Sequence, residues 1–378
     1  MNDIKKYDYI DALRGVAVLL VIVVHTGMLF DIGLFPKIFQ LIQGNGARGV
    51  QLFFILSSLT LFMSYLTRKN QEQNTKKNFF IRRFFRIAPM YYVMIVVGLF
   101  YFGLGARYWL GDASGISFVN VFSHFTFLSG LSPYYMNSIL GVEWSVGVEM
   151  LFYLLIPFLA TKIKSTNQAL QLFLGTIIVV VPINYVLGKM TVIGNQNLWN
   201  DFLFLWLPNQ LPVFVLGVIL YFVIVKNDRK FNLYYLAPLI FFFLFGFKNG
   251  RFWIYTVSMF FTFCILYVWK SNTKLVVNKL FIFFGKISYS VYLVHFIILD
   301  MMLKYMKPVG MGYQNIFYFA LYFMLLAALS TLVAYTTYSL IEKNGIKLGK
   351  YIIERKEKKT AEKISKQNLE IDASITPL

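Results

Sequence analysis

The sequence predicts an all-α polytopic membrane protein, a bundle of about ten transmembrane helices. Of its 378 residues 58% are hydrophobic and 19% are aromatic, whereas only 14% are charged. Soluble domains carry about 25% charged residues. Apolar runs close to the roughly 20 residues that cross a bilayer alternate with short polar segments along most of the chain. The two observations together exclude an ordinary soluble domain.

The apolar runs predict ten spans, and one further segment is too short to be counted. Span boundaries are expected near residues 13–30, 47–66, 87–106, 141–160, 169–188, 203–225, 232–247, 251–269, 280–303 and 315–341. The stretch 115–131 is fairly apolar but short, and we expect an interfacial or re-entrant segment there. Residues 1–341 are thus expected to form a membrane-embedded domain. Residues 342–378, rich in Lys and Glu, should form a charged cytoplasmic tail that is partly helical or disordered.

The distribution of charge predicts the orientation of the bundle. A net charge of +19 is large enough to bind nucleic acid, but most of the 36 Lys and Arg residues lie between the apolar runs. They gather in alternate connecting segments, as the positive-inside rule describes, so we expect both termini to be cytoplasmic. Membrane lipids rather than nucleic acid are therefore the expected partners. The single cysteine, Cys264, excludes a cysteine-based metal site, and we expect neither a metal nor a permanently bound cofactor.

The first span carries the most informative pair of residues. Arg14 and His25 are eleven residues apart, about three helical turns, and therefore share one face of the helix. Ionisable side chains are rare within membrane helices and usually mark function. Asp11, three residues before Arg14, can hold the guanidinium. A neutral imidazole near mid-membrane can accept a proton from a hydroxyl. The alternative is a histidine satisfied by a neighbouring helix, with Arg14 as an interfacial anchor.

A basic cluster precedes the third span. Arg82, Arg83 and Arg86 stand just before Pro89, and Arg83 and Arg86 lie one helical turn apart. Guanidinium groups bind phosphate with two parallel hydrogen bonds, so the cluster can hold a polyphosphate ligand. Ordinary positive-inside anchoring is the alternative explanation.

Two further spans carry polar stripes. Ser145 and Glu149 are four residues apart on the fourth span, where a carboxylate is costly unless it is paired or neutral. Ser288, Tyr292 and His295 follow at positions i, i+4 and i+7 on the ninth span. A structural ion pair in the first case, and interhelical hydrogen bonding in the second, explain these residues without catalysis.

Taken together these stretches resemble the acyltransferase 3 family of bacterial integral-membrane acyltransferases, from about residue 9 to about residue 341. The matching residues, in chain order, are Asp11, Arg14, Gly15 and His25; Phe53, Phe54 and Ser57; Arg83 and Arg86; Trp144, Ser145, Glu149 and Tyr153; and Ser288, Tyr289, Tyr292 and His295. The chain departs from the family at Gln51, where many members have an aspartate. A role that needs an acid at that position is therefore in doubt.

The resemblance implies transfer of an acyl group, usually acetyl from acetyl-coenzyme A, to a sugar hydroxyl of a cell-surface or secreted polysaccharide. It also implies a location in the bacterial cytoplasmic membrane. In such a scheme the guanidinium groups of Arg82, Arg83 and Arg86 bind the donor phosphates on the cytoplasmic side. His25 acts as general base or transient acyl carrier, and Arg14 stabilises negative charge or steers the donor.

The remaining polar residues have less definite expected roles. Glu149 is expected to orient His25 or to bind the acceptor. Structural or acceptor-binding roles fall to Asp11, Trp144, Ser145, Ser288, Tyr289, Tyr292 and His295. Buried ionisable groups also suit a transporter or a flippase for a lipid-linked saccharide, which is the main alternative function. A purely structural or sensing membrane protein is the third interpretation. The glycan acceptor, the acyl chain and the oligomeric state stay open.

Overall fold

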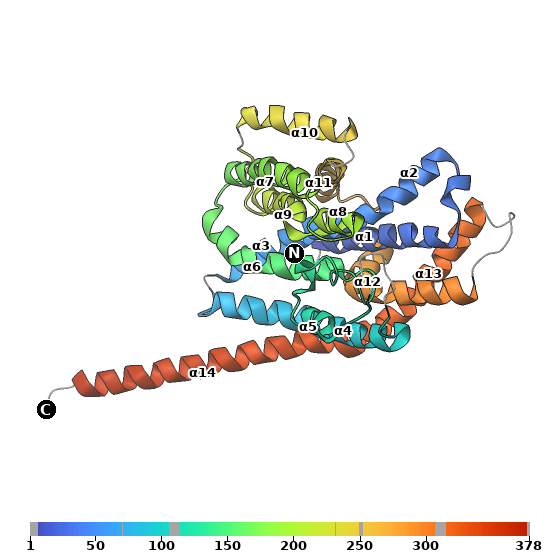
Figure 1. The fold of residues 1–378 in the computed structure, drawn as a ribbon. Coiled ribbons are helices and arrows are strands. Elements are labelled where there is room, and N and C mark those ends of the chain that lie inside the picture. The colour runs from blue at the N-terminus through green and yellow to red at the C-terminus, as the bar shows by residue number, and fades with distance from the viewer. Residues whose placement is uncertain are drawn as a thin grey trace.

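The computed structural model describes residues 7–69, 71–105, 114–230, 232–248, 252–306 and 315–375, and the regular elements in these ranges are helices (Figure 1). The helices are α1 (Asp8–Thr26), α2 (Lys37–Asn45), α3 (Gly49–Arg68), α4 (Thr75–Phe102), α5 (Phe118–Phe125), α6 (Trp144–Lys162), α7 (Thr166–Leu187), α8 (Gln196–Leu205), α9 (Leu207–Leu220), α10 (Leu236–Lys248), α11 (Trp253–Ser271), α12 (Lys279–Tyr305), α13 (Ile316–Thr337) and α14 (Lys343–Ile375).

Within the described residues, nine helical segments are long and apolar enough to cross a membrane, which confirms the predicted fold class. The segments are Asp8–Leu29, Lys37–Arg68, Thr75–Phe102, Trp144–Lys162, Thr166–Leu187, Gln196–Val225, Trp253–Ser271, Lys279–Tyr305 and Ile316–Lys358. The predicted re-entrant stretch contains only the eight-residue α5 and a short 3-10 turn. Ala106 and Arg251, each at the margin of a predicted span, lie outside the described residues, as do residues 376–378 of the predicted tail.

The tenth predicted span, near 232–247, corresponds to the shorter helix α10. Its 13 residues cover about 20 Å, less than the roughly 30 Å hydrocarbon core. Its two ends nevertheless reach opposite ends of the bundle. Just before it, Asp228 accepts a hydrogen bond from the backbone N–H of Thr166, at the start of α7. Just after it, the Trp253 indole donates to Asn45, at the end of α2. The chain therefore passes from one end of the bundle to the other along α10.

Close packing of α1 on α12 places the polar residues of the first span, Arg14 and His25, on a helix directly beside the one that carries Ser288, Tyr292 and His295. A Cβ atom on Gly285 of α12 would lie 1.7 Å from the carbonyl oxygen of Asp11, and one on Gly15 would lie 2.1 Å from that of Phe281. No side chain fits at either position, so the two backbones approach as small residues allow in membrane helices. Further along the same pair of helices this approach brings His25 beside His295.

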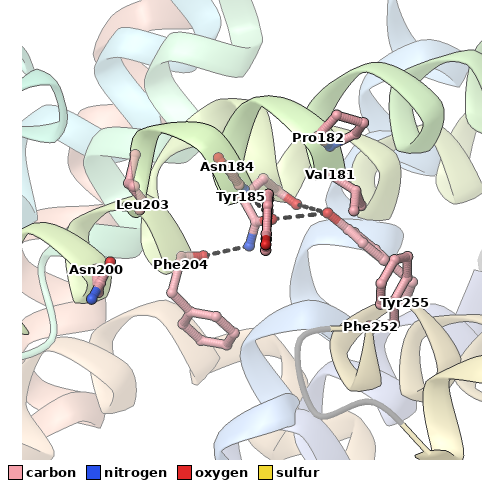
Figure 2. Close-up of a pocket in the computed structure, with 11 residues that line it drawn as sticks. Val181, Pro182, Asn184, Tyr185, Asn200, Leu203, Phe204, Phe252 and Tyr255 are labelled. Atoms are coloured by element: carbon pink, nitrogen blue, oxygen red, sulfur yellow. Dashed lines mark hydrogen bonds between the residues drawn. The ribbon is translucent and has the colours of Figure 1, made fainter. Parts of the chain in front are cut away.

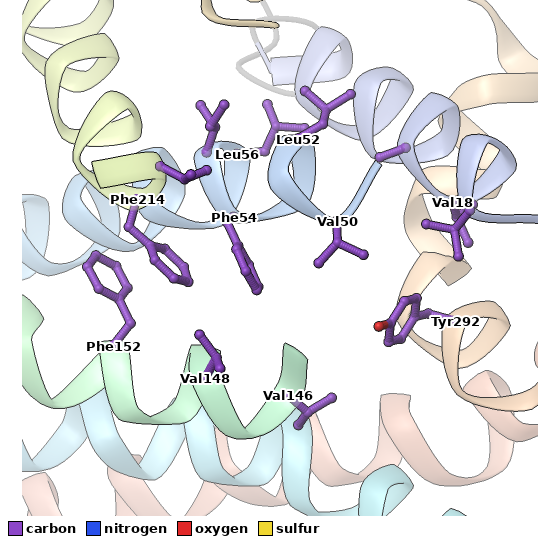
Figure 3. Close-up of a cluster of buried hydrophobic side chains, with 14 of the residues drawn as sticks. Val18, Val50, Leu52, Phe54, Leu56, Val146, Val148, Phe152, Phe214 and Tyr292 are labelled. Carbon is purple, nitrogen blue, oxygen red and sulfur yellow. The ribbon is translucent and has the colours of Figure 1, made fainter. Parts of the chain in front are cut away.

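Stacked aromatic rings join α3, α6 and α9 beside this pair (Figure 3). The ring of Phe214 on α9 stacks on Phe54 of α3 at 4.4 Å and on Phe152 of α6 at 4.0 Å. All three side chains are buried. Such offset ring pairs add about 0.5–1.5 kcal/mol each beyond their buried area. They provide a rigid apolar wall for the polar site described below.

Much of the predicted tail is a long helix whose first half belongs to the bundle. A short π-helical turn, Tyr338–Glu342, joins α13 to α14, which runs beside α4 and then projects past the other helices (Figure 1). A Cβ atom on Gly345 would lie 2.6 Å from the carbonyl oxygen of Phe85, so only glycine permits this approach. The side-chain amide of Asn78 donates to Glu357 at 2.8 Å. The start of α14 is therefore packed against the basic start of α4.

Candidate functional site

A cavity of about 80 Å³ lies at the meeting point of α1, α3, α4, α6 and α12. The polar groups that line it are Arg14, Ser57, Arg83, Arg86, Ser145, Glu149, Tyr153, Ser288, Tyr289 and Tyr292. Eight of these residues were predicted as site residues from four separate stretches of sequence. We call this space the central cavity. Its apolar wall includes Val50, Phe54 and Val146, which belong to the cluster seen in Figure 3.

Arg14 is held on two sides. Its guanidinium donates to the hydroxyl of Thr60 on α3 at 3.0 Å and lies 3.6 Å from the carboxylate of Asp11. The contact with Asp11 is the one that the i, i+3 spacing predicts. One cation is thus fixed at the cavity by a neutral hydroxyl and a single, distant carboxylate, which leaves donor capacity for a ligand.

Glu149 faces the same cavity from α6. Its carboxylate accepts hydrogen bonds from the hydroxyls of Ser57 and Tyr153, the latter at 2.8 Å. The expectation that Glu149 orients His25 finds no support here, because the partner of His25 is His295 on α12. Glu149 shares its cavity with Arg14, Arg83 and Arg86 instead. The physical reason is the length of α1, since His25 is its penultimate residue and Arg14 lies near its beginning.

The two histidines form a directly bonded pair next to the central cavity, although His25 does not line it. Nδ1 of His25 lies 2.9 Å from Nε2 of His295, and the ring centroids are 5.0 Å apart. His295 is fully buried, whereas His25 is only partly so. The ring of Tyr292, which does line the cavity, lies 5.8 Å from that of His295. One aromatic ring therefore separates the cavity from the histidine pair.

Hydrogen bonding assigns the tautomers of the pair. Nδ1 of His295 lies 2.7 Å from the carbonyl oxygen of Tyr292, which can only accept, so this nitrogen carries the proton. In a neutral ring Nε2 of His295 is then an acceptor, and it accepts a hydrogen bond from the Nδ1–H of His25. The lone pair of His25 is consequently on Nε2. Partner groups of this kind commonly fix which nitrogen of a functional histidine reacts.

The other polar residues of α6 and α12 hold the helices together. Ser145 donates to the hydroxyl of Tyr292 at 2.8 Å, and that hydroxyl donates to the carbonyl of Val142 at 2.7 Å. Ser288 donates to the carbonyl of Gly285 within its own helix, and Tyr289 reaches the carbonyl of Ile87 on α4. Trp144 packs edge-on against the ring of Phe54, 5.9 Å away. These contacts fix the walls of the central cavity.

The predicted basic cluster divides between two cavities. Arg83 and Arg86 line both the central cavity and a second cavity of about 410 Å³ between α4, the end of α3 and α14. We call the second space the vestibule and the two arginines the arginine partition. Arg82 lines only the vestibule, where it makes hydrogen bonds of 2.6 and 3.1 Å to the two carboxylate oxygens of Glu72. Predicted as a donor ligand, Arg82 is already neutralised by this pair.

Sequence reasoning missed a second buried cluster, around His124 and Glu143. Both side chains are fully buried and lie 3.5 Å apart, and the Glu143 carboxylate also accepts from the backbone N–H groups of Ile139 and Val142. Burial by itself would raise the pKa of Glu143, but the hydrogen bond and charge of His124 and the backbone N–H groups outweigh it and lower this pKa. The single histidine in a short segment gave no signal of this partner.

A cavity larger than the central cavity and the vestibule lies elsewhere and is lined by none of the predicted site residues. It has a volume of about 670 Å³ and lies between α7, α8, α9 and the start of α11 (Figure 2). Its buried polar groups satisfy one another, since Asn184 and Tyr255 both donate to Asn209 and Asn209 donates to the carbonyl of Phe204. Gln51, the departure from the family motif, likewise donates to Gln210 at 3.2 Å. Polar networks of this kind are structural.

A family model described as an acyltransferase domain matches residues 7–338, nearly all of the membrane bundle and the whole of the central cavity. The chain belongs to the acyltransferase 3 family. It is similar, at 32% identity over 41% of its length and 24% of the other chain, to peptidoglycan O-acetyltransferase OatA of Listeria monocytogenes. A Caenorhabditis elegans protein, regulator of hypoxia-inducible factor 1, is 30% identical over 51% of this chain and 41% of its own.

More extensive matches have lower identity. A Staphylococcus aureus protein named for O-acetyltransferase activity is 26% identical over 80% of this chain and 52% of its own length. A protein of Acidianus two-tailed virus, named for acetyltransferase activity, is 28% identical over 79% and 85%. This chain thus covers about half or less of the cellular relatives named here. No solved structure gives a significant match.

Proposed function

We propose that this acyltransferase domain transfers an acetyl group from acetyl-coenzyme A to a sugar hydroxyl of a cell-surface or secreted polysaccharide, in the bacterial cytoplasmic membrane. The observation that carries the proposal is the arrangement of three neighbouring features. Arg83 and Arg86, which make no ion pair within the described residues, line a narrow polar cavity. Tyr292 on the wall of this cavity packs near His295, which in turn holds Nδ1 of His25 and leaves its Nε2 free to accept a proton. The names of the relatives from Listeria and Staphylococcus support O-acetylation as the reaction class.

The arginine partition is proposed to bind the phosphates of the donor. Ion pairs in the described part of the chain engage Arg14, Arg68 and Arg82 but neither Arg83 nor Arg86. The Nε atom of Arg83 is buried without a hydrogen-bond partner. Cations held in a largely buried site without a directly paired carboxylate favour an anionic ligand, and guanidinium groups match phosphate in geometry. The thioester arm then extends through the central cavity, past Tyr292, to His25.

Reaction at His25 follows from its tautomer. Nε2 removes the proton of the sugar hydroxyl while the sugar oxygen attacks the thioester carbonyl, the C–S bond breaks, and the thiolate of coenzyme A receives the proton. His295 acts as a positioning residue, because it holds Nδ1 of His25 and thereby keeps Nε2 free. The same free Nε2 is competent to attack the thioester itself and carry the acetyl group to the sugar as a transient acyl-imidazole.

Arg14 is proposed to stabilise the negative charge of the donor or to steer the donor, from its position on the cavity wall. Glu149 is proposed to keep the hydroxyls of Ser57 and Tyr153 in place and to bind the acceptor or donor through the same wall. Asp11, Trp144, Ser145, Ser288 and Tyr289 maintain the shape of this wall through the contacts described above.

The experiment compares O-acetylation of cell-envelope glycans in cells that lack the gene and carry either the wild-type protein or His25→Ala. We expect His25→Ala to lower acetylation by about 10²–10⁴-fold, the usual contribution of a general base. Protein abundance in the membrane and thermal unfolding in detergent should match wild type. Normal acetylation by a folded, inserted His25→Ala protein would refute the role of this imidazole.

A further inference from the structure

The vestibule is a site for which the proposed reaction has so far given no occupant. Its inner wall is the arginine partition on α4, and its outer wall is the first half of α14. That helix begins at Lys343, beyond the residues 7–338 that match the family. Five cationic side chains line the vestibule against three carboxylates: Arg68, Arg82, Arg83, Arg86 and Lys350 against Glu72, Glu354 and Glu357. Two positive charges are therefore in excess.

The excess charge lies at the arginine partition. Glu72 forms ion pairs with Arg82 at 2.6 Å and with Arg68 at 3.6 Å. Glu357 accepts from Asn78, and Glu354 lies 3.6 Å from Lys350. The Lys350–Glu354 pair is largely exposed and therefore weak, so its ammonium group is easily turned toward a ligand. An anion entering the vestibule would meet unpaired guanidinium groups on one side and this lysine on the other.

Cavity sizes decide which part of a donor fits in each space. The central cavity, at about 80 Å³, equals the liquid volume of about three water molecules. It accommodates a slender chain but not a nucleotide. The vestibule, at about 410 Å³, lies within the range of about 300–1,000 Å³ that is usual for pockets of drug-sized ligands. A donor with a bulky head and a thin arm therefore fits in only one direction.

The face of α14 that lines the vestibule has the chemistry of a nucleotide site. Ile346, Lys350, Ile353, Glu354 and Glu357 stand at i, i+4, i+7, i+8 and i+11, which is one face of the helix. Ile346, which is 38% exposed, provides an apolar surface for a flat base, and the carboxylates can accept from an exocyclic amine. Lys350 offers a charge to phosphate. Ile353 is only 6% exposed, so this face is already docked and ordered.

We propose that α14 forms the nucleotide-binding wall of the vestibule: the nucleoside of the coenzyme A donor lies on Ile346, and its phosphates lie between Lys350 and the arginine partition. The inference rests on the proposed function, and it adds a donor-recognising element outside the part of the chain that matches the family. In this arrangement α14 selects donors that carry the nucleotide half of coenzyme A, and the central cavity receives only the thioester arm.

The experiment compares two donors, acetyl-coenzyme A and S-acetyl-pantetheine, which has the thioester arm without the nucleotide. The purified protein is tested as the wild type and as two variants. Lys350→Glu reverses a charge in the vestibule, and Ile346→Trp fills the vestibule with a larger side chain. Lys347→Glu is the matched control, because it makes the same charge change at an exposed position of α14 that does not line the vestibule. We expect Lys350→Glu and Ile346→Trp to raise KM for acetyl-coenzyme A at least about tenfold, the loss of one charge-assisted hydrogen bond or its equivalent.

The expected pattern further includes an unchanged KM for S-acetyl-pantetheine, an unchanged kcat with both donors, and wild-type behaviour of Lys347→Glu. Equal effects on the two donors, or no effect on either, would overturn the assignment of the vestibule. If the wild type turned over neither donor, the proposed function would fail, and binding would then decide the inference alone. In that case coenzyme A, but not pantetheine, should raise the Tm of the wild type more than that of Lys350→Glu; an equal or absent rise would overturn it.

Discussion

Glu143 and Glu149 stand six residues apart on either side of the first turn of α6, yet their surroundings are opposite. Glu143 is fully buried, its carboxylate accepts from two backbone N–H groups, and His124 lies 3.5 Å from it. Glu149 accepts only from two hydroxyls and faces a cavity with three guanidinium groups. The first cluster is closed, because every charge has a protein partner. The second is open, because its positive charges exceed the carboxylates that line the same space.

The difference gives a criterion for function in a membrane bundle. Buried ionisable groups that are fully paired stabilise the arrangement of helices, as around Glu143. Groups whose charge is left unbalanced favour a ligand that supplies the balance, as at Arg83 and Arg86. Residue type alone does not separate the two cases, since both clusters contain a glutamate and lie near a histidine.

The largest expected effect separates the two glutamates. Glu143→Gln removes the buried carboxylate, and we expect a loss of about 3–5 kcal/mol of stability near neutral pH. Because the pKa of Glu143 is lowered by folding, the wild type should lose this contribution as the pH falls through that lowered pKa. Thermal unfolding of the two proteins should therefore converge in acid. Glu149→Gln should keep most of its Tm but lose acetyl transfer, and the reverse pattern would contradict the comparison.

A smaller effect is expected at His295, which does not line the central cavity and is proposed to act through His25. His295→Ala leaves Nδ1 of His25 without its acceptor, so the tautomer with a free Nε2 is no longer enforced. We expect kcat to fall by about 10–100-fold, while KM for acetyl-coenzyme A stays within about twofold. A rise in KM with unchanged kcat would show that His295 shapes donor binding and does not position the base.

Much of the fold could be predicted from the sequence because its determinants are local. Span lengths follow from runs of apolar residues, and nine predicted spans coincide with long helices in the described ranges. The tenth predicted span corresponds to α10, an apolar helix shorter than the nine span-length segments. The packing of α14 on α4 could not be predicted, since it depends on the fit of Gly345 and Gly349 against Phe85. From composition alone, the segment that contains Gly345 and Gly349 would be read only as a charged tail.

The predicted site residues largely lie together in the structure, but the sequence did not show which of them pair with each other. The family motifs named Arg14, Arg83, Arg86 and Glu149 as site residues, and in the structure these four side chains line the central cavity. The motifs did not show that His25 is bonded to His295, because the register between α1 and α12 is set by the contacts of Gly15 and Gly285. The pairing of Arg82 with Glu72 was equally hidden, since it requires the turn between α3 and α4 to fold back.

Binding of coenzyme A to the arginine partition tests the central claim most directly. The measurement is the dissociation constant for coenzyme A, by calorimetry or thermal shift, of the wild type, Arg83→Ala/Arg86→Ala and the matched control Lys76→Ala/Lys77→Ala. The control removes two exposed lysines of the same helix, and neither lysine lines the central cavity or the vestibule. We predict that Kd rises at least about 100-fold for the arginine variant, the loss of two charge-assisted contacts, and by less than about threefold for the control. Equal affinity in all three proteins would contradict the account.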